Sequence, residues 1–357
     1  MVINMKIILP LALPIINTYP CIANPLSIIQ LNPDSRDWIY SNFLSLSARR
    51  ESECNSFAVY LSNGAQLWTD ILIWEKCPYI SFWKIERWIF EQYRIDIVDF
   101  IIQAINREQY VYLYVRKADI YEYKSTDLSR SHDIMIYGYD TENAVFYAKD
   151  YFDVYYESRI IEQNQLRTAF NMCSKNKQKD MLEGVICFSQ PNGDEAKRNL
   201  AMYEKCSPTL RYINLYRENL DEFLGFRYNS EKNANTDIFF NGINVFDAFS
   251  SYIASSSNFP FHITCDIQLM IDFFNILSCI MKNGLRNEII ESKLKEIQKK
   301  LKHIQMSFMK LSIKGKSDLI CRAILLSIMQ VRELAYNTVM SMRDYLSKIS
   351  YIGDEIL

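Results

Sequence analysis

The fold of this chain is decided in the stretch SHDIMIYGYD (residues 131–140), which is followed closely by AVFYAKD (residues 144–150). Both stretches are rich in β-branched and aromatic residues, and the polar cluster at 140–143 between them is typical of a turn. The pattern predicts an antiparallel hairpin, in which the start of the first strand lies beside the end of the second. His132 and Asp150 are then neighbours at one end of the hairpin.

A histidine beside a carboxylate is the pair that activates a thiol or hydroxyl nucleophile, because the carboxylate fixes the tautomer of the base. The chain has only three histidines, at 132, 262 and 303, and only His132 lies in a sequence of this kind. A structural role is the alternative, with His132 hydrogen-bonded to backbone at a strand end and Asp150 serving as a turn residue.

Length and composition indicate a folded protein with one large domain or two ordinary ones, since 49% of its 357 residues are hydrophobic and 14% are aromatic. The net charge of −2, from 40 basic and 42 acidic residues, argues against a nucleic-acid binder. No phosphate-binding glycine loop is present. The chain has nine cysteines, at positions 21, 54, 77, 173, 187, 206, 265, 279 and 321. They form no CxxC pair, so we expect no metal site. Their odd number without a disulfide spacing fits a protein of the reducing cytoplasm.

Hydrophobic periodicity predicts an α+β region up to about residue 190 and a helical region after it. In the first region we expect an extended segment at 5–16, helices at 79–93, 96–107 and 162–169, and strands at 110–115, 154–161 and 184–189. Residues 37–46 fit a strand or a helix, and 47–56 are polar. The second region reads as helices at 194–205, 208–223, 243–255, 265–283, 286–312 and 315–347. The expected domains are therefore 1–190 and 191–357.

The N-terminal apolar run does not have the form of a signal peptide. Pro10 and Pro14 interrupt it, and Tyr19-Pro20 stands where a signal peptidase requires small residues. No other run reaches the roughly 18 uninterrupted apolar residues of a membrane span. We therefore expect a cytoplasmic protein without a membrane partner, whose N-terminal segment lies at a sheet edge.

Two upstream cysteines are candidates for the nucleophile. Cys21 precedes Pro25, which is well placed as the first residue of a helix, and a helix N-terminus favours a thiolate. Asn17, four residues before Cys21, is a candidate oxyanion donor. Cys54 lies in a charged loop whose acidic neighbours disfavour a thiolate, so it is the alternative nucleophile. For either cysteine the structural interpretation is a small buried hydrophobic residue.

The order Cys, then HDIMIYGYD, then YAKD resembles the papain-like cysteine peptidases that trim bacteriocin leaders. It is closer to their non-proteolytic relatives, such as the butirosin-pathway acyltransferase family and the closthioamide amide synthetase. The resemblance covers roughly residues 5–190 and implies a papain-like domain, an antiparallel sheet with packed helices. It also implies His132 as base, Asp150 as its orienting carboxylate and an upstream cysteine as nucleophile. The glutamine and the Cys-Gly pair of the proteolytic members are missing here.

Three functions follow as hypotheses. The first is acyl transfer with amide-bond formation in bacterial specialised metabolism, in which Cys21 takes an acyl group from a thioester. The resemblance then implies an acyl or peptidyl carrier protein and a small amine as partners, with no cofactor beyond the carrier's phosphopantetheine. The second is a catalytically silent peptidase-like scaffold or binding partner. The third is a leader-type cysteine peptidase.

Overall fold

The computed structural model describes residues 5–51, 56–61, 74, 77–124, 131–153, 155–175, 184–191, 208–225, 237–256, 259–260, 262–282 and 286–354. The chain is α+β, with antiparallel sheets and a predominantly helical C-terminal region, as the sequence predicts. It divides into two compact units, which are described separately. The first comprises Met1–Ser35 and Leu67–Tyr203, and the second comprises Arg36–Gln66 and Glu204–Leu357.

The first unit is built on a seven-stranded antiparallel sheet with β6 (Ser131–Asp140) and β7 (Val145–Tyr151) near its centre. These two strands form the predicted hairpin. Along the sheet the order is β4-β9-β5-β6-β7-β8, and β1 pairs with the last three residues of β6. The remaining strands are β1 (Lys6–Ile8), β4 (Ser81–Glu86), β5 (Tyr110–Arg116), β8 (Tyr156–Glu162) and β9 (Gly184–Ser189).

Gly138 allows β1 to approach the hairpin. A Cβ atom at this position would lie 2.7 Å from the carbonyl oxygen of Ile7 and 3.0 Å from the Cα of Ile8. The register of β6 against β7 also shifts between Ile136 and Gly138. The central strand therefore needs a residue without a side chain where it meets both neighbours.

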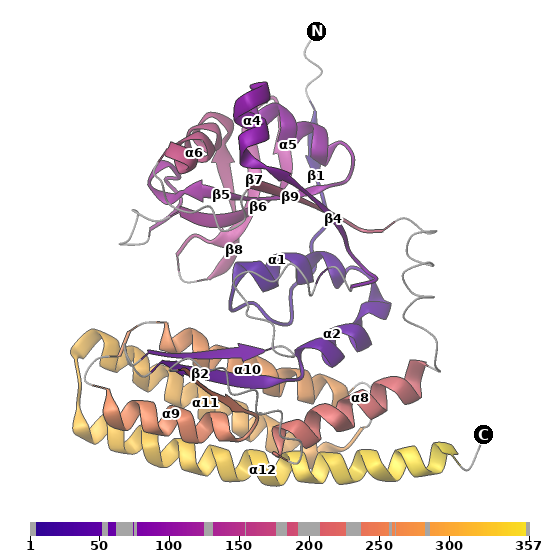
Figure 1. Cartoon of the computed structure of the whole chain (residues 1–357), viewed down its shortest axis with the longest axis vertical. Helices are drawn as coiled ribbons and strands as arrows, with labels where there is room; N and C mark the ends of the chain where they lie inside the picture. The colour runs from indigo at the N-terminus through magenta and orange to yellow at the C-terminus, as the bar shows by residue number, and fades with distance from the viewer. Residues whose placement is uncertain are drawn as a thin grey trace. The chain divides into compact units, whose positions relative to one another are not determined.

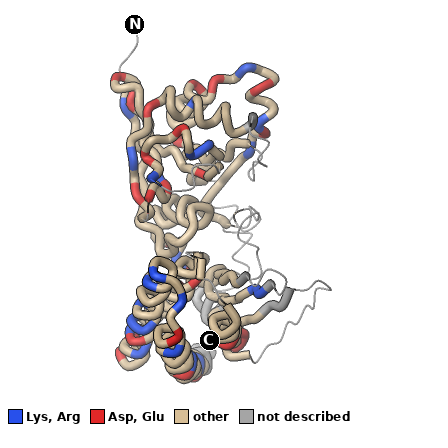
Figure 2. Tube along the Cα trace, turned by 90° about the vertical axis from the view of Figure 1, so that its left-hand side faces the viewer, with Lys and Arg blue, Asp and Glu red and all other residues tan. Residues whose placement is uncertain are grey.

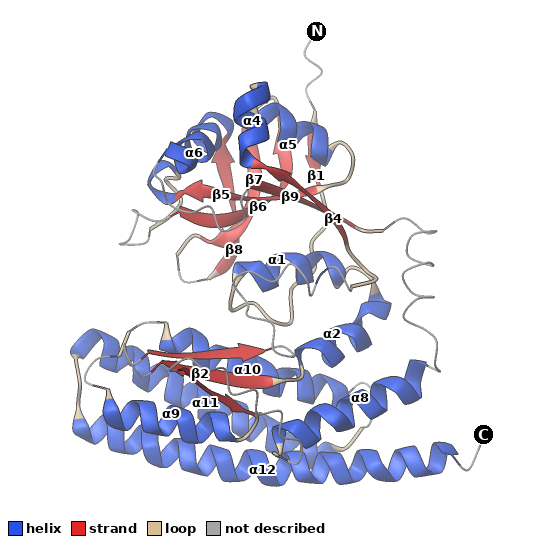
Figure 3. Ribbon diagram, viewed as in Figure 1, coloured by secondary structure: helices blue, strands red, loops and turns tan. Residues whose placement is uncertain are grey.

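Helices cover both faces of this sheet (Figures 1 and 3). α1 (Pro20–Ile29) lies on one side and packs against β6 and β7. On the other side lie α4 (Arg87–Tyr93), α5 (Ile97–Ile105) and α6 (Gln163–Lys175). The Asp96 side chain caps α5 by accepting hydrogen bonds from the N–H groups of Val98 and Asp99.

The second unit combines a small sheet with a helical bundle. Its sheet has the order β10-β2-β3 and is antiparallel. The strands are β2 (Leu46–Glu51), β3 (Ser56–Leu61) and β10 (Asp237–Asn241), and the helices are α2 (Arg36–Phe43), α8 (Pro208–Phe223), α9 (Asn244–Ser255), α10 (Ile263–Ile280), α11 (Glu288–Lys314) and α12 (Asp318–Asp354).

The long helix α11 buries one stripe of side chains spaced three and four residues apart, as the sequence predicts. Its lysines occupy exposed or half-exposed positions. In Figure 2, both basic and acidic residues are seen along the helices of this unit. Among the described residues, α10 alone is long and apolar enough to cross a membrane, and 72% of it is buried, which packing in a protein core explains.

Several predicted elements differ from the structure. The helix expected at 79–93 is strand β4 followed by α4, because the first part pairs with β9. Of the segment 37–46, which fitted a strand or a helix, residues 37–43 lie in helix α2. Leu46 begins strand β2, which extends into the polar segment 47–56 and pairs with β3 and β10. Pro25 lies inside α1 and does not begin it. The helix expected at 194–205 lies outside the described residues.

The two units also differ from the expected pair of consecutive domains, 1–190 and 191–357. The chain passes from the first unit to the second between residues 203 and 204, near the expected boundary. Residues 36–66, however, also belong to the second unit. This segment supplies two strands of the small sheet, whose third strand is β10. Long-range pairing of this kind leaves no local signal in the sequence.

Candidate functional site

His132 and Asp150 lie together at the rim of the large sheet. His132 is the second residue of β6 and Asp150 lies near the end of β7, and the pairing of these strands brings Nδ1 of His132 to 3.0 Å from Oδ2 of Asp150. The Asp150 side chain is fully buried, whereas a quarter of the His132 side chain is exposed. The imidazole is therefore accessible to solvent on one side and contacts a buried carboxylate on the other.

The imidazole also makes the kind of backbone interaction that the structural alternative predicted. Nδ1 of His132 lies 2.9 Å from the carbonyl oxygen of Asp133. Both acceptors call for a proton on Nδ1. In the neutral imidazole the lone pair is then on Nε2, which is the nitrogen available to a reacting group.

A second carboxylate, that of Asp133, approaches the same nitrogen. Its Oδ1 lies 3.5 Å from Nδ1 of His132, and its Oδ2 accepts a hydrogen bond from the Tyr112 hydroxyl. Burial and the neighbouring Asp150 raise the pKa of Asp133, although the His132 charge opposes this shift. Two acidic side chains thus share one imidazole.

These carboxylates determine the charge of His132. Burial by itself lowers its pKa, but the charge and hydrogen bond of Asp150, together with the charge of Asp133, raise the pKa of His132 to about 9. The Lys117 ammonium opposes the rise. At neutral pH the imidazole is therefore mostly protonated.

Cys21 lies in the first turn of α1, the helix that packs against β6 and β7. Burial and the charge of Asp133 raise the pKa of the Cys21 thiol, while the backbone N–H groups of Cys21 and Ile22 lower it. The helix N-terminus thus acts in the predicted direction but is outweighed. The Asp133 carboxylate that influences the thiol is the one that lies beside His132.

Hydrogen bonding holds α1 near this rim. The Tyr156 hydroxyl on β8 donates to Oδ1 of Asn24, 2.5 Å away and one helical turn beyond Cys21. Asn24 is buried, and its Nδ2 has no hydrogen-bond partner among the described residues. Pro25 has no N–H group with which to donate the helical hydrogen bond to the carbonyl of Cys21.

Asn17, the predicted oxyanion donor, is half-buried in the segment that leads to α1. Cys54, the alternative nucleophile, lies outside the described residues. Three residues around the His132–Asp150 pair were not predicted from the sequence: Tyr112, Tyr123 and Asp133. Tyr123 comes from an irregular segment without a periodic signal, and Asp133 adjoins His132 in a strand where successive side chains point to opposite faces.

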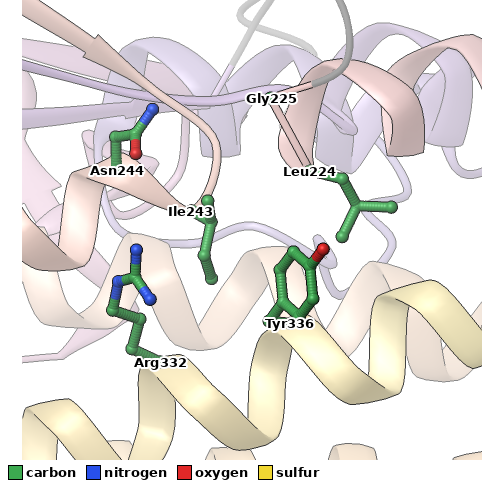
Figure 4. A pocket seen from close by; sticks show the side chains of 6 residues that line it. All are labelled: Leu224, Gly225, Ile243, Asn244, Arg332 and Tyr336. Atoms are coloured by element: carbon green, nitrogen blue, oxygen red, sulfur yellow. The ribbon is translucent and has the colours of Figure 1, made fainter.

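The second unit contains a separate hollow of about 380 Å³ (Figure 4). It is lined by Leu224, Gly225, Ile243, Asn244, Arg332 and Tyr336. Nε of Arg332 lies 2.8 Å from Oδ1 of Asp247, so that the main charge at the hollow has an ionic partner. These lining residues include neither a nucleophilic thiol nor a histidine.

Among the described residues, no three histidine, cysteine or acidic side chains are grouped so as to hold a metal ion. The chemistry that the rim of the large sheet can support is that of an imidazole, two carboxylates and a thiol. Comparison with protein-family models and with curated proteins found no match to this chain.

Proposed function

We propose that the first unit is a cysteine-dependent acyltransferase that forms amide bonds from carrier-bound thioesters, with Cys21, His132 and Asp150 as its triad. The observation that carries the proposal is the 3.0 Å contact between His132 and Asp150 on the strands against which the Cys21 helix packs. An oriented imidazole beside a thiol at a helix N-terminus is the arrangement that covalent acyl transfer requires.

The charge of His132 decides the order of proton transfers. In this proposal the His132 imidazolium, on a strand against which the Cys21 helix packs, stabilises the thiolate against the burial and the Asp133 charge that oppose it. The thiolate attacks the thioester carbonyl carbon, the carbon–sulfur bond to the carrier breaks, and the imidazolium protonates the departing thiol. The acyl group is then held on Cys21 and His132 is neutral.

An amine resolves this acyl-enzyme. Its nitrogen attacks the acyl carbon, neutral His132 takes a proton from it, and the bond to the Cys21 sulfur breaks. The products are an amide and the original thiolate–imidazolium pair, so that atoms and charges balance over the cycle. The missing glutamine of the proteolytic members favours this reaction over peptide cleavage.

A silent scaffold is the second candidate, and the environment of the thiol is the observation that favours it. Both burial and the Asp133 carboxylate disfavour the Cys21 thiolate. If the imidazolium does not offset them, the thiol stays protonated and the domain serves to bind a partner.

The test is acylation of the protein by N-acetylcysteamine thioesters, followed by mass spectrometry and by transfer to added amines. We expect one acyl group on Cys21, and loss of both adduct and amide in Cys21→Ala. Cys265→Ala, at a partly exposed thiol of the second unit, is the matched control. Iodoacetamide labelling at neutral pH distinguishes Cys21 from Cys54.

Acyl transfer by Cys21→Ala at the wild-type rate would overturn the triad assignment. Cleavage of leader peptides without reaction at thioesters would indicate the peptidase. Absence of any adduct, with the fold intact, would leave the scaffold as the better account.

A further inference from the structure

Tyr123 makes the one further polar contact to Asp150 that the described residues show. Its hydroxyl donates a hydrogen bond to Oδ2, the same oxygen that faces Nδ1 of His132. The other oxygen, Oδ1, is buried without a hydrogen-bond partner among the described residues. All the directional contacts of this carboxylate therefore converge on one atom.

The position of Tyr123 is fixed by its own surroundings. The residue is buried, and its ring lies 5.0 Å from that of Phe152 and 5.8 Å from that of His132, centroid to centroid. The next residue, Lys124, donates its backbone N–H to the carbonyl of Phe152, two residues beyond Asp150. This bond ties the segment that carries Tyr123 to the end of β7.

The Tyr123 hydroxyl acts as a hydrogen-bond donor throughout the physiological pH range. Burial and the charge of Asp150 raise the pKa of Tyr123 well above its usual range, so its hydroxyl keeps its proton. A hydroxyl that donates to a carboxylate disperses part of the negative charge of that carboxylate. The electrostatic attraction between Asp150 and the His132 imidazolium, which shares Oδ2, is then weaker.

We propose that Tyr123 is a positioning residue, whose hydroxyl holds Oδ2 of Asp150 against His132 and moderates the charge that the imidazole meets. The inference deepens the proposed function, because it assigns to the triad a fourth member that the sequence does not indicate. Six charged or titratable groups act on this imidazole or on its carboxylate partners. Three act on His132 itself: Asp150 in β7, Asp133 in β6 and Lys117. Tyr123 acts through Asp150, and Tyr112 in β5 and Cys21 in α1 act through Asp133.

Removal of the hydroxyl in Tyr123→Phe leaves a buried carboxylate whose remaining partner is the imidazole. We expect the carboxylate to hold the protonated imidazole more tightly, and the pKa of His132 to rise by roughly one unit. The measurement is an NMR titration of the His132 ring, which is tractable because the chain has three histidines. Histidine substitutions at 262 and 303 assign the signals.

Tyr139→Phe is the matched control. Tyr139 is also fully buried and loses one hydrogen bond, which it donates to the neutral Oδ1 of Asn106 at 2.6 Å, so His132 should titrate as in the wild type. In an Asp150→Asn background, Tyr123→Phe should no longer move the titration, because the charge that it moderates is gone. An unchanged or lowered value in Tyr123→Phe, with near-ultraviolet circular dichroism preserved, would overturn the proposal.

The acylation assay gives the functional readout. The step that needs neutral His132 should shift to higher pH in Tyr123→Phe by the same interval as the titration, with little change in KM for the thioester. If Cys21→Ala remains active, the proposed function fails while the titration still tests Tyr123. If the titration does not move, Tyr123 has only a structural role even where Cys21 proves essential.

Discussion

A buried carboxyl in the second unit makes the stability of this protein depend on pH. Asp266, in the first turn of α10, is almost fully buried. Its Oδ1 accepts a hydrogen bond of 2.8 Å from the backbone N–H of Val59 in β3, and its Oδ2 has no partner among the described residues. Burial raises the pKa of Asp266 from 3.8 to about 8, although the Val59 contact acts in the opposite direction.

The sign follows from proton binding. Because the pKa of Asp266 is higher in the folded protein, the folded state binds more protons than the unfolded state between about pH 4 and pH 8. The stability that the neutral carboxyl contributes is complete below pH 4 and is lost as the pH rises through 8. At about 1.4 kcal/mol per pKa unit, the shift corresponds to an upper limit of about 6 kcal/mol. Relaxation of the structure and entry of water reduce this contribution to the free energy of unfolding, and we expect it to be at least about 2 kcal/mol.

Asp266→Asn removes the ionisation and keeps the shape. Burying the amide adds an offset that does not depend on pH, so the quantity to measure is how the difference in unfolding free energy between variant and wild type changes with pH. Relative to the wild type, the free energy of unfolding of Asp266→Asn should rise by at least about 2 kcal/mol between pH 5 and pH 8.5. A difference that stays constant within about 0.5 kcal/mol would refute the reasoning.

Urea unfolding followed by ¹⁹F NMR of 5-fluorotryptophan-labelled protein isolates the relevant unit. Trp38 is the one tryptophan in the sequence ranges of the second unit, so its signal reports that unit alone. Asp344→Asn, at a carboxylate on α12 whose side chain is 60% exposed, is the control. An exposed carboxylate keeps its water on folding, so this change should not reproduce the pH dependence.

Two further substitutions test the large sheet. Asp150→Asn should lower the pKa of His132 from about 9 by more than one unit, because Asp133 is then the one carboxylate that raises this pKa against the lowering effects of burial and Lys117. An NMR titration that still gives a pKa near 9 would show that Asp150 is not the main partner of His132. Gly138→Ala should destabilise the first unit by about 1–3 kcal/mol, since the added Cβ meets the backbone of β1 at 2.7 Å. Urea unfolding of the variant measures this cost, and wild-type stability would mean that β1 does not pair as described.

Much of the first unit was predictable because its decisive elements are local. The hairpin of β6 and β7, the strand β5 and the helix α5 follow from runs of β-branched and aromatic residues or from one apolar face. The meeting of His132 with Asp150 follows from the antiparallel geometry of that hairpin. The heptad-like stripe of α11 was predictable for the same reason.

What the sequence could not determine depends on contacts between distant segments. The sequence of β4 fits a helix as well as a strand, and its pairing with β9 decides between them. Residues 36–66 join the second unit through a sheet completed by β10. Tyr123 reaches Asp150 and the His132 ring from an irregular segment, and the Asp133 carboxylate lies 3.5 Å from the imidazole of its neighbour, although alternation along a strand predicts opposite faces for the two residues. Local sequence patterns thus determined the central hairpin and, through its antiparallel geometry, the His132–Asp150 pair, because both depend on neighbouring residues. The partners and charges around that pair were decided by the tertiary packing alone, because they come from distant segments.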